Sequence, residues 1–377
     1  MLRLDRIQVK GFKSIWSMDL ELHSLNVLIG ANGSGKSNFT LLFSLLNQLA
    51  SQNLQLFVGR LGGADRLLHY GQKVTDSIKI DLCFADGLLY QCELVPSYDD
   101  TLIFAREEIY QAKTFSNGDE PLGRTNLGVG HKESKLHICS QKIARQILEA
   151  MKSWRVYHFH DTSSSAKVKQ TQDIDDNWFL REDGSNLAAY LYLLQQRDRA
   201  YYANIVDTIR MVAPFFDDFI LRPSPLNSSK IKLAWREKGS RDPQSVGINF
   251  DAAAFSDGTL RFISLATLLL QPQLPTTILL DEPELGLHPY AIGLLSDLLR
   301  SAATKSQVIV CTQSVTLINQ FAPEEIIVVE RQGGHSTLRQ TQGSAFERLV
   351  PEEIALWLEE YDIGELWEKN VVGGRPS

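Results

Sequence analysis

The sequence predicts an α/β fold built around a phosphate-binding loop, and three observations support this prediction. A short apolar run, residues 25–29, precedes a glycine-rich loop at residues 30–37, and apolar residues at helical spacing follow that loop. A second apolar run, residues 277–280, ends in an acid, Asp281. Between them, residues 76–112 alternate apolar and polar side chains in three short runs, which predicts an antiparallel β subdomain.

The loop at residues 30–37 reads G-x-x-x-x-G-K-S, a complete phosphate loop. Its glycines allow consecutive N–H groups to point at one spot, where the start of the following helix adds the positive end of its dipole. We therefore expect ATP here, with Lys36 neutralising the β and γ phosphates and the Ser37 hydroxyl coordinating Mg²⁺. The predicted nucleotide-binding residues of this segment are Asn32, Gly33, Gly35, Lys36, Ser37 and Asn38.

The composition is that of a globular protein with a sizeable core: 377 residues, of which 44% are hydrophobic. The net charge of -7 excludes a global basic field for nucleic acid. The charge does not exclude a local basic face, for which the candidates are Arg3, Arg6, Lys10 and Lys13. The four cysteines occur singly without a C-x-x-C pair, and the sequence shows no signal peptide or long apolar span, so we expect a reduced cytoplasmic protein with no membrane association.

Periodicity and turn residues divide the chain into four predicted segments. Residues 1–24 predict a pair of strands broken at Gly11 and Phe12, residues 113–135 a polar surface loop, and residues 186–212 one long helix. Alternation at residues 231–235 predicts one further strand. The segments are an N-terminal lobe with the phosphate loop and the β meander at 1–112, a mainly helical insertion at 113–240, a C-terminal lobe at 241–345 and a tail at 346–377.

Two histidines in the insertion raise the possibility of a metal site. Residues 156–161 predict a strand on which His158 and His160 share one face. Only one carboxylate, Asp161, lies beside them and the sequence offers no third clear ligand. A structural or hydrogen-bonding role is therefore favoured over a metal site for these histidines.

The second half of the chain carries the remaining parts of the predicted nucleotide site. Ser256 or Asp257 is expected to cap an apolar helix and to present free N–H groups to an anion, together with Gly258. Asp281, at the end of a buried strand, is placed to hold Mg²⁺ through water, and the adjacent Glu282 to orient or deprotonate the attacking water. A later strand ends before Gln313, the candidate for the γ phosphate.

This order of motifs resembles the ABC-type ATPases of the RecF and SMC branch. Residues 281–289, which read D-E-P-E-L-G-L-H-P, are similar to RecF-like ATPases and to the ATPase half of overcoming-lysogenization-defect nucleases. The resemblance implies an ABC-type P-loop fold and a homodimer, or a higher oligomer, that sandwiches ATP. Ser256 and Gly258 of one protomer would then contact the γ phosphate bound to Lys36 of the other.

The chain departs from that resemblance at two points. Gln313 stands where the family usually has a switch histidine, and a neutral amide cannot carry a proton charge, so we expect slow hydrolysis. The residues after Gln313 are too few for a Toprim nuclease domain, and no heptad run for a coiled-coil arm is present. The resemblance therefore implies an ATPase that acts in DNA repair or anti-phage defence, with DNA as a candidate ligand, beside a separate effector protein such as a Toprim-type nuclease.

Three other functions are alternatives to this one. A transport cassette would have L-S-G-G-Q where this chain has residues 256–259. A small-molecule kinase or GTPase would need no Ser-Asp-Gly helix start, and the sequence lacks the N-K-x-D stretch that specifies the nucleotide. A slowly hydrolysing ATP-gated clamp with no nucleic-acid role remains the alternative, because Gln313 leaves it open although Glu282 favours hydrolysis. Docking of the effector is expected on the insertion at Trp178, Phe179, Tyr201 and Tyr202. The carboxylates of Asp173, Asp175 and Asp176 lack the apolar strands that a two-metal nuclease site needs.

Overall fold

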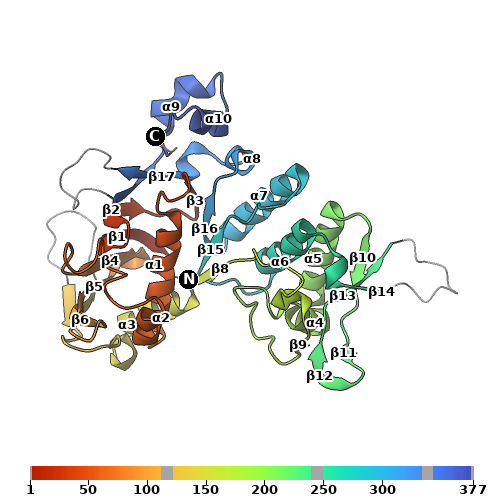
Figure 1. The fold of residues 1–377 in the computed structure, drawn as a ribbon, viewed down its shortest axis with the longest axis horizontal. Helices are drawn as coiled ribbons and strands as arrows, with labels where there is room; N and C mark the ends of the chain where they lie inside the picture. The colour runs from red at the N-terminus through yellow and green to blue at the C-terminus, as the bar shows by residue number, and fades with distance from the viewer. Residues whose placement is uncertain (1, 112–121, 239–248, 333–342, 375–377) are drawn as a thin grey trace. The chain divides into compact units, whose positions relative to one another are not determined.

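A computed structural model describes residues 2–111, 122–238, 249–332 and 343–374. The chain forms two compact units (Figure 1). The first unit comprises Met1–Val156, Pro275–Leu279 and Ser306–Ser377, and the second comprises Tyr157–Leu274 and Leu280–Lys305. We describe each unit by itself.

The first unit contains a six-stranded antiparallel sheet, in the order β2-β1-β4-β5-β6-β7. Its strands are β1 (Leu4–Phe12), β2 (Ile15–Glu21), β4 (Ile78–Phe84), β5 (Leu88–Pro96), β6 (Leu102–Gln111) and β7 (Leu122–Asn126), with the 3₁₀ turn η1 (Ala85–Gly87) between β4 and β5. The predicted meander is confirmed. The predicted break at Gly11 and Phe12 is wrong, because β1 runs through both and turns at Lys13, whose φ is 46°.

The strand β7 corrects the prediction of a surface loop over residues 113–135. It pairs with β6 at the edge of the sheet, where a strand needs only one apolar face or none, so its polar sequence gave no strand signal. Residues 112–121 of the predicted loop lie outside the described residues.

A second sheet has the order β18-β17-β3-β16-β15-β8, and its strands β17, β3 and β16 run parallel. The strands are β3 (Leu25–Ile29), β8 (Arg155–Tyr157), β15 (Thr277–Asp281), β16 (Gln307–Thr312), β17 (Ile326–Gln332) and β18 (Gly343–Arg348). Val27 of β3 pairs with Val310 on one side and Ile326 on the other, and all five β3 residues are buried. Central parallel strands are covered on both faces, which explains the continuous apolar runs.

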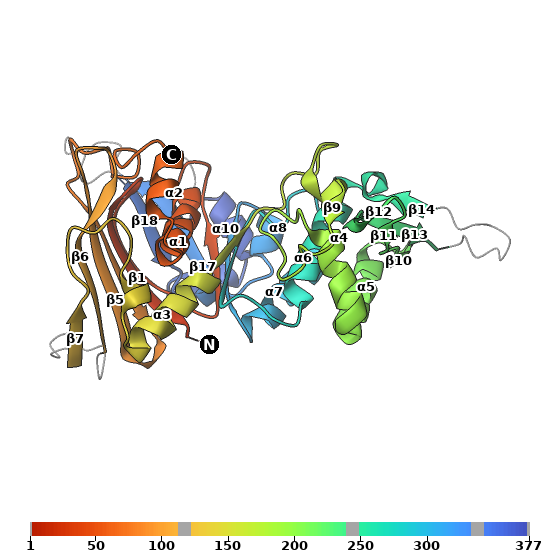
Figure 2. The same ribbon diagram turned by 90° about the horizontal axis from the view of Figure 1, so that it is seen from below.

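The helix α1 (Lys36–Ala50) fills the space beside both sheets (Figure 2). Its apolar residues belong to one buried cluster that includes Ile7 and Ile80 of the antiparallel sheet and Ile309 of the parallel one. Two further helices, α2 (Leu54–Arg60) and α3 (Lys142–Ser153), contact α1, and η2 (Leu136–Ile138) precedes α3. The strand, loop and helix predicted around the phosphate loop are thus confirmed, and the helix is fixed by burial rather than by capping.

The carboxyl-terminal part of the first unit contains three short helices. They are α8 (Val315–Ile318), α9 (Pro351–Leu358) and α10 (Ile363–Glu368), with the 3₁₀ turn η5 (Pro323–Glu325) before β17. The sequence predicts a short helix over residues 352–360, which α9 confirms, but it does not predict α10, which buries Leu366 and Trp367 and contacts α8. The sequence predicts two closing strands, over residues 325–330 and 336–339. The first is confirmed as β17, and the second lies outside the described residues. β17 pairs with β18.

The second unit is built on four helices: α4 (Leu187–Arg197), α5 (Arg199–Val212), α6 (Asp257–Leu270) and α7 (Pro289–Ala303). The helix α6 is buried along residues 260–269 and contacts both α5 and α7, as expected of a helix that is apolar on every face. The prediction of one long helix over residues 186–212 is wrong. Asp198 leaves the helical conformation and separates α4 from α5, since aspartate favours helix ends over helix interiors.

Two small sheets complete the second unit, in the orders β10-β13-β14 and β11-β12-β9. Their strands are β9 (Gln172–Asp173), β10 (Phe216–Phe219), β11 (Pro223–Ser224), β12 (Asn227–Ile231), β13 (Ala234–Glu237) and β14 (Asn249–Asp251), with η3 (Lys167–Lys169) and η4 (Ala252–Ala254). The single strand predicted over residues 231–235 is therefore two strands in different sheets. Trp235 stacks on Phe250 and Phe255, which anchors β13.

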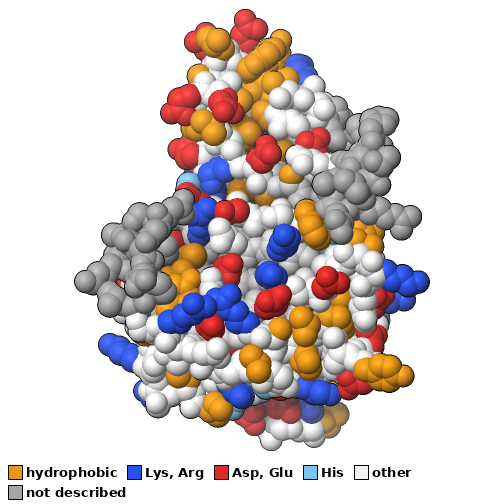
Figure 3. All heavy atoms as spheres, turned by 90° about the vertical axis from the view of Figure 1, so that its left-hand side faces the viewer, with side chains coloured by type: hydrophobic (Ala, Val, Ile, Leu, Met, Phe, Trp, Pro, Cys, Tyr) orange, Lys and Arg blue, Asp and Glu red, His pale blue; other side chains and the backbone are white. Residues whose placement is uncertain are grey.

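The predicted basic face is largely neutralised within the first unit. Arg3 pairs with Asp5, Arg6 pairs with Asp19, and Lys10 lies over the ring of Trp16. The face drawn in Figure 3 carries acidic and basic side chains interspersed. Of the four cysteines, Cys83, Cys92 and Cys311 are buried and Cys139 is half-buried, as expected for small core residues.

Candidate nucleotide-binding site

The phosphate loop connects β3 to α1 and curls through local hydrogen bonds. Ser34 donates its N–H to the Ala31 carbonyl over 3.1 Å, and Phe39 donates to Gly35 over 3.0 Å. Gly33 and Gly35 have φ angles of 81° and 125°, which L side chains rarely adopt. Because no side chain of the described residues caps the first turn of α1, its N–H groups face the loop as the motif predicts.

The two glycines differ in their surroundings. A Cβ on Gly33 would have no atom within 4 Å, whereas a Cβ on Gly35 would lie 2.1 Å from Ser344 Oγ. Gly33 therefore lines an open side of the loop, where a phosphate has room to approach the backbone. Gly35 marks the packed side, where the loop meets β18.

Lys36 is turned onto the loop. Its side chain is buried, and its Nζ donates to the carbonyl of Gly30 and, over 3.1 Å, to that of Ala31. Phosphate oxygens are stronger acceptors for an ammonium group than backbone carbonyl oxygens are. The arrangement fits a group that exchanges backbone carbonyls for a bound phosphate.

Gln313 lies at the phosphate loop, as the sequence predicted. It follows Thr312, the last residue of β16, which pairs with Ile29 at the end of β3. The amide Nε2 of Gln313 donates to Asn32 Oδ1 over 2.8 Å. A neutral donor is thus positioned on the loop by the parallel pairing of two buried strands.

A serine pair beside the loop was not predicted from the sequence. Asn38 donates from Nδ2 to Ser14 Oγ over 2.7 Å, and Ser14 Oγ lies 2.8 Å from Ser344 Oγ. The two serines come from the β1–β2 turn and from β18, so only the tertiary fold brings them together. Asn38 therefore has a role in holding the loop, and Ser37 is the exposed hydroxyl of this segment.

The carboxyl-terminal segment also reaches the loop. Gly374 accepts a hydrogen bond from the Ala31 N–H over 2.7 Å, and a Cβ on Gly374 would lie 3.6 Å from Gly30 Cα. Sequence reasoning found no chemistry in this tail. The only signal was the pair Gly373 and Gly374, both of which have positive φ.

In the second unit, the acidic segment follows the last residue of β15, Asp281. Glu282 has a φ of 40°, and a positive φ in a non-glycine residue indicates a backbone that the surroundings constrain. The turn continues with hydrogen bonds from Leu285 N to Glu282 O over 3.2 Å and from Leu287 N to Glu284 O over 2.9 Å. Asp281 and Glu282 thus lie at the start of a tight turn.

The predicted helix start at residues 256–258 packs against this turn. The Ser256 hydroxyl caps α6 by accepting from Thr259 N over 3.2 Å, as predicted, and the Asp257 side chain is exposed. A Cβ on Gly258 would lie 2.2 Å from the carbonyl oxygen of Gly286. Glycine is required here because the acidic turn approaches the helix backbone too closely for any side chain.

Arg261, one turn further along α6, was missed by sequence reasoning. It is 6% exposed and donates to the carbonyls of Phe159 and His160 over 3.0 and 3.2 Å. Burial lowers the pKa of its guanidinium, and the nearby carboxylates of Asp257 and Glu284 oppose that shift. A buried arginine therefore links α6 to the segment that carries the two histidines.

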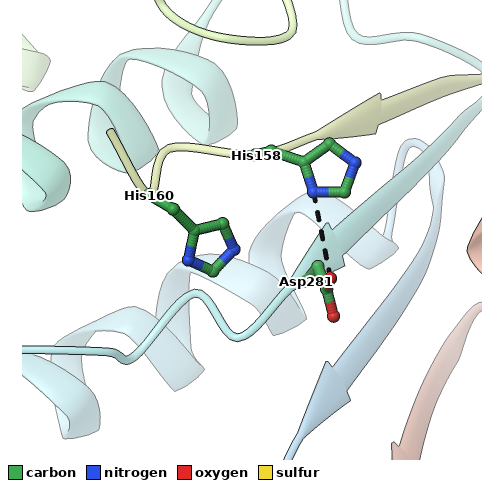
Figure 4. Close-up of side chains that lie close together, drawn as sticks. All are labelled: His158, His160 and Asp281. Carbon is green, nitrogen blue, oxygen red and sulfur yellow. Dashed lines mark ion pairs between the residues drawn. The ribbon is translucent and has the colours of Figure 1, made fainter. Parts of the chain in front are cut away.

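That segment is not the strand predicted over residues 156–161, because β8 ends at Tyr157. His158 instead donates its N–H to the Glu182 carbonyl over 2.9 Å. The side chains of His158 and His160 lie on the same side as Asp281, and His158 Nδ1 is 3.9 Å from Asp281 Oδ2 (Figure 4). Desolvation lowers the pKa of His158, the Asp281 carboxylate opposes this shift, and His160 adds to it.

The predicted docking residues of the second unit are exposed, with one exception. Trp178, Phe179 and Tyr201 are exposed, while Tyr202 is buried and donates to Asp218 over 2.6 Å. The acids near residue 175 are occupied in part by surface ion pairs, with Asp173 bonded to Lys230 and Asp176 to Arg181. Over the described ranges, the group of side chains suited to a metal ion is His158, His160 and Asp281. No helix in these ranges is long and apolar enough to cross a membrane.

Two family models match parts of the sequence. Residues 145–319 match a family described as an AAA domain, putative AbiEii toxin, Type IV TA system. Residues 1–74 match a protein of unknown function, DUF2813. No curated protein matches the sequence.

Solved structures of SMC head domains share the fold. An SMC head bound to the C-terminal winged-helix domain of ScpA is 15% identical, with a TM-score of 0.58 over 93% of this chain and 99% of the other. An SMC head with an extended coiled coil from Pyrococcus furiosus, bound to the C-terminal domain of ScpA, is 15% identical, with a TM-score of 0.56 over 96% and 99%. The predicted α/β fold of the ABC and SMC type is confirmed.

Proposed function

We propose that this chain, which has the ABC-type ATPase fold of SMC heads, binds ATP with Mg²⁺ and hydrolyses it as a dimer that controls a separate effector. The observation that carries the proposal is the complete phosphate loop between a buried strand and a buried helix, with Gln313 bonded to Asn32 at its edge. The residues of that loop suit a triphosphate, because Gly33 leaves one side open and Lys36 brings a buried charge to it.

The first unit would supply nucleotide binding. The N–H groups of residues 33–37 would donate to phosphate oxygens, and Lys36 would move from the carbonyls of Gly30 and Ala31 to the β and γ phosphates. The exposed Ser37 hydroxyl would coordinate Mg²⁺ together with Asp281. Mg²⁺ would supply charge neutralisation on the phosphate oxygens.

Two residues would act on the attacking water and the γ phosphate. Glu282, held at positive φ, would orient or deprotonate the water. Gln313 would donate one neutral hydrogen bond to the γ phosphate, worth on the order of 1 kcal/mol net. Because such a bond stabilises developing charge less than an imidazolium does, hydrolysis would be slow.

The helix start at Ser256 and Gly258 would complete the site of a second protomer. The Ser256 hydroxyl caps α6, and the first N–H groups of that helix form an anion-binding end. In a dimer these groups would contact the γ phosphate bound at Lys36 of the partner. ATP would then act as the bridge that holds two chains together.

The output is proposed to come from another polypeptide. The SMC heads with the same fold are bound to a separate protein, ScpA. The exposed Trp178, Phe179 and Tyr201 give the second unit an aromatic surface for such a contact. By the resemblance described above, the setting would be DNA repair or anti-phage defence, and the effector a nuclease, with DNA as a further candidate ligand.

The test compares ATP binding and hydrolysis in three variants. Lys36→Ala removes the charge that phosphates contact and should weaken ATP binding roughly 10- to 150-fold, the equivalent of 1.5–3 kcal/mol for a charged hydrogen bond. Glu282→Gln should keep ATP binding, lose turnover and accumulate a dimer in size-exclusion chromatography. Lys10→Ala, an exposed lysine over Trp16, is the control and should behave as the unaltered chain. Normal hydrolysis by Glu282→Gln would overturn the assignment of the base.

The alternative function is an ATP-gated clamp with hardly any turnover, and the neutral Gln313 is the observation that favours it. A clamp and a slow ATPase differ in what ends the dimer. If the ATP-bound dimer dissociates at the rate of phosphate release, the chain is an ATPase switch. If dissociation events greatly outnumber turnovers, so that the dimer opens without hydrolysing ATP, the clamp is correct.

A further inference from the structure

Two imidazoles and one carboxylate converge in the second unit. A nitrogen of His158, a nitrogen of His160 and a carboxylate oxygen of Asp281 all lie within 4.8 Å of one another (Figure 4). The histidines come from the segment after β8, and Asp281 ends β15, so more than a hundred residues of sequence separate them. The sequence alone offered two ligands and no third.

The backbone that carries the histidines is fixed on both sides. The His158 N–H is bonded to the Glu182 carbonyl, and the carbonyls of Phe159 and His160 accept from the buried Arg261. Asp281 is fixed by its place at the end of a strand whose preceding residues are buried. Ligands on a backbone that is already ordered lose little conformational freedom when an ion binds. The three side chains are therefore suited to binding an ion.

The donor set indicates the class of ion. Imidazole nitrogens suit zinc, copper, nickel and iron, whereas magnesium and calcium are bound by oxygen ligands. Two nitrogens and one carboxylate oxygen give three protein ligands, and a site with three protein ligands leaves a further position for water or another group. The side chains are partly accessible, with His158 exposed and the other two half-buried, so an ion can enter from solvent.

We propose that His158, His160 and Asp281 bind a divalent first-row transition-metal ion of the zinc class, and that this ion inhibits ATP hydrolysis. The inhibition rests on the proposed function, because Asp281 is also the carboxylate assigned to the Mg²⁺ of ATP. One carboxylate bound to a zinc-class ion beside two imidazoles is no longer available to position that Mg²⁺. The same residue would thus couple metal availability to the ATPase cycle.

The binding test uses Zn²⁺ by calorimetry and Co²⁺ by visible absorption, with the full chain and no nucleotide. We expect one ion per chain, and affinity reduced roughly 10- to 100-fold in His158→Ala and in His160→Ala. His137→Ala is the matched control, because His137 is exposed and lies in the first unit, where its Nδ1 is 3.0 Å from the Ser134 carbonyl oxygen. His160→Gln replaces the alanine variant if His160→Ala does not fold. Binding that is absent, or equal in all four proteins, overturns the site.

The inhibition test measures ATP turnover at fixed Mg²⁺ while Zn²⁺ is raised, each protein being compared with its own zinc-free rate. The unaltered chain and His137→Ala should lose turnover as the site fills, and the two alanine variants should resist the same Zn²⁺ concentrations. Equal inhibition of all proteins overturns the coupling. If the unaltered chain hydrolyses no ATP at all, the proposed function fails while the calorimetric result still decides the metal site.

Discussion

The phosphate loop and the acidic segment at residues 281–287, the two parts of the proposed ATP site, are held by different kinds of contact. The curl of the loop is made by near neighbours in sequence, such as Ser34 N to Ala31 O and Lys36 Nζ to the Gly30 carbonyl, while distant residues such as Ser344 contact it from outside. The acidic segment is fixed by distant residues, with Gly286 packed against Gly258 and with Arg261 beside it. A local motif therefore forms the first part, whereas the second depends on the packing of the whole unit.

The largest effect that would sharpen this comparison is expected at Gly35. In Gly35→Ala the new Cβ would overlap Ser344 Oγ at 2.1 Å, and the alanine backbone would have to adopt a φ of 125°. The unfolding free energy should therefore fall by more than about 3 kcal/mol. Gly33→Ala has a positive φ but an open surrounding, and should cost only about 1–2 kcal/mol. Urea denaturation followed by circular dichroism measures both. Equal losses would show that the packing at Ser344 does not matter.

The next effect concerns the acidic segment. Gly258→Ala places a Cβ 2.2 Å from the Gly286 carbonyl, and such overpacking should cost about 1–3 kcal/mol and displace the acidic turn. Gly293→Ala is the matched control, because Gly293 also lies in a helix and has no atom within 4 Å of its Cβ position. That variant should gain about 0.5–1 kcal/mol from helix propensity. Thermal unfolding measures the stability of both variants. A Gly258→Ala variant as stable as the unaltered chain would contradict the comparison.

A smaller effect is expected from the side-chain bond between the loop and Gln313, the residue after β16. Gln313 Nε2 donates to Asn32 Oδ1 over 2.8 Å. In a double-mutant cycle, the coupling between Asn32→Ala and Gln313→Ala should therefore be about 1 kcal/mol in ATP-binding free energy. Calorimetry with a non-hydrolysable ATP analogue measures the four affinities. Additive effects would mean that the contact does not contribute to the site.

The smallest effect is expected at the tail. Gly374→Ala brings a Cβ to 2.9 Å from Val328 Cγ1 at a φ of 81°, which should loosen the tail from the loop and release the Ala31 N–H. If that N–H then serves a phosphate, ATP affinity should rise by up to about fivefold, the equivalent of 1 kcal/mol. Gly130→Ala, with a similar φ of 76° and open surroundings, controls for backbone strain. A fall in affinity for Gly374→Ala alone would instead make the tail a support of the loop.

Sequence reasoning succeeded where the signal is local. The order of β3, phosphate loop and α1, the cap at Ser256 and the strand that ends at Asp281 each follow from a few neighbouring residues. These features need only an apolar run, a turn and a capping side chain, so periodicity and motif are sufficient to find them. Gln313 could be placed at the loop because parallel strands end at one edge of a sheet.

Sequence reasoning failed where distant residues decide the structure. Ser14 and Ser344 meet at Asn38 only because β1, β2 and β18 come together in the fold. Asp281 lies beside His158 and His160, but more than a hundred residues of sequence separate it from them, so the sequence offers no signal for this third ligand. Edge strands such as β7 and breaks such as Asp198 carry weak patterns, since tertiary contacts rather than local preference determine them.

The central claim is that each ATP is held by Lys36 of one chain and by the Ser256 helix start of another, and a mixing experiment tests it most directly. Lys36→Ala and Ser256→Asp should each be inactive, the second because aspartate still caps α6 but places a negative charge toward the γ phosphate. Their heterodimer would contain one intact site, built from the unaltered Lys36 of one chain and the unaltered Ser256 of the other. ATP hydrolysis should therefore return when the two variants are mixed. Continued inactivity, with heterodimers observed by native mass spectrometry, would contradict a shared site and place all the residues of each site in one chain.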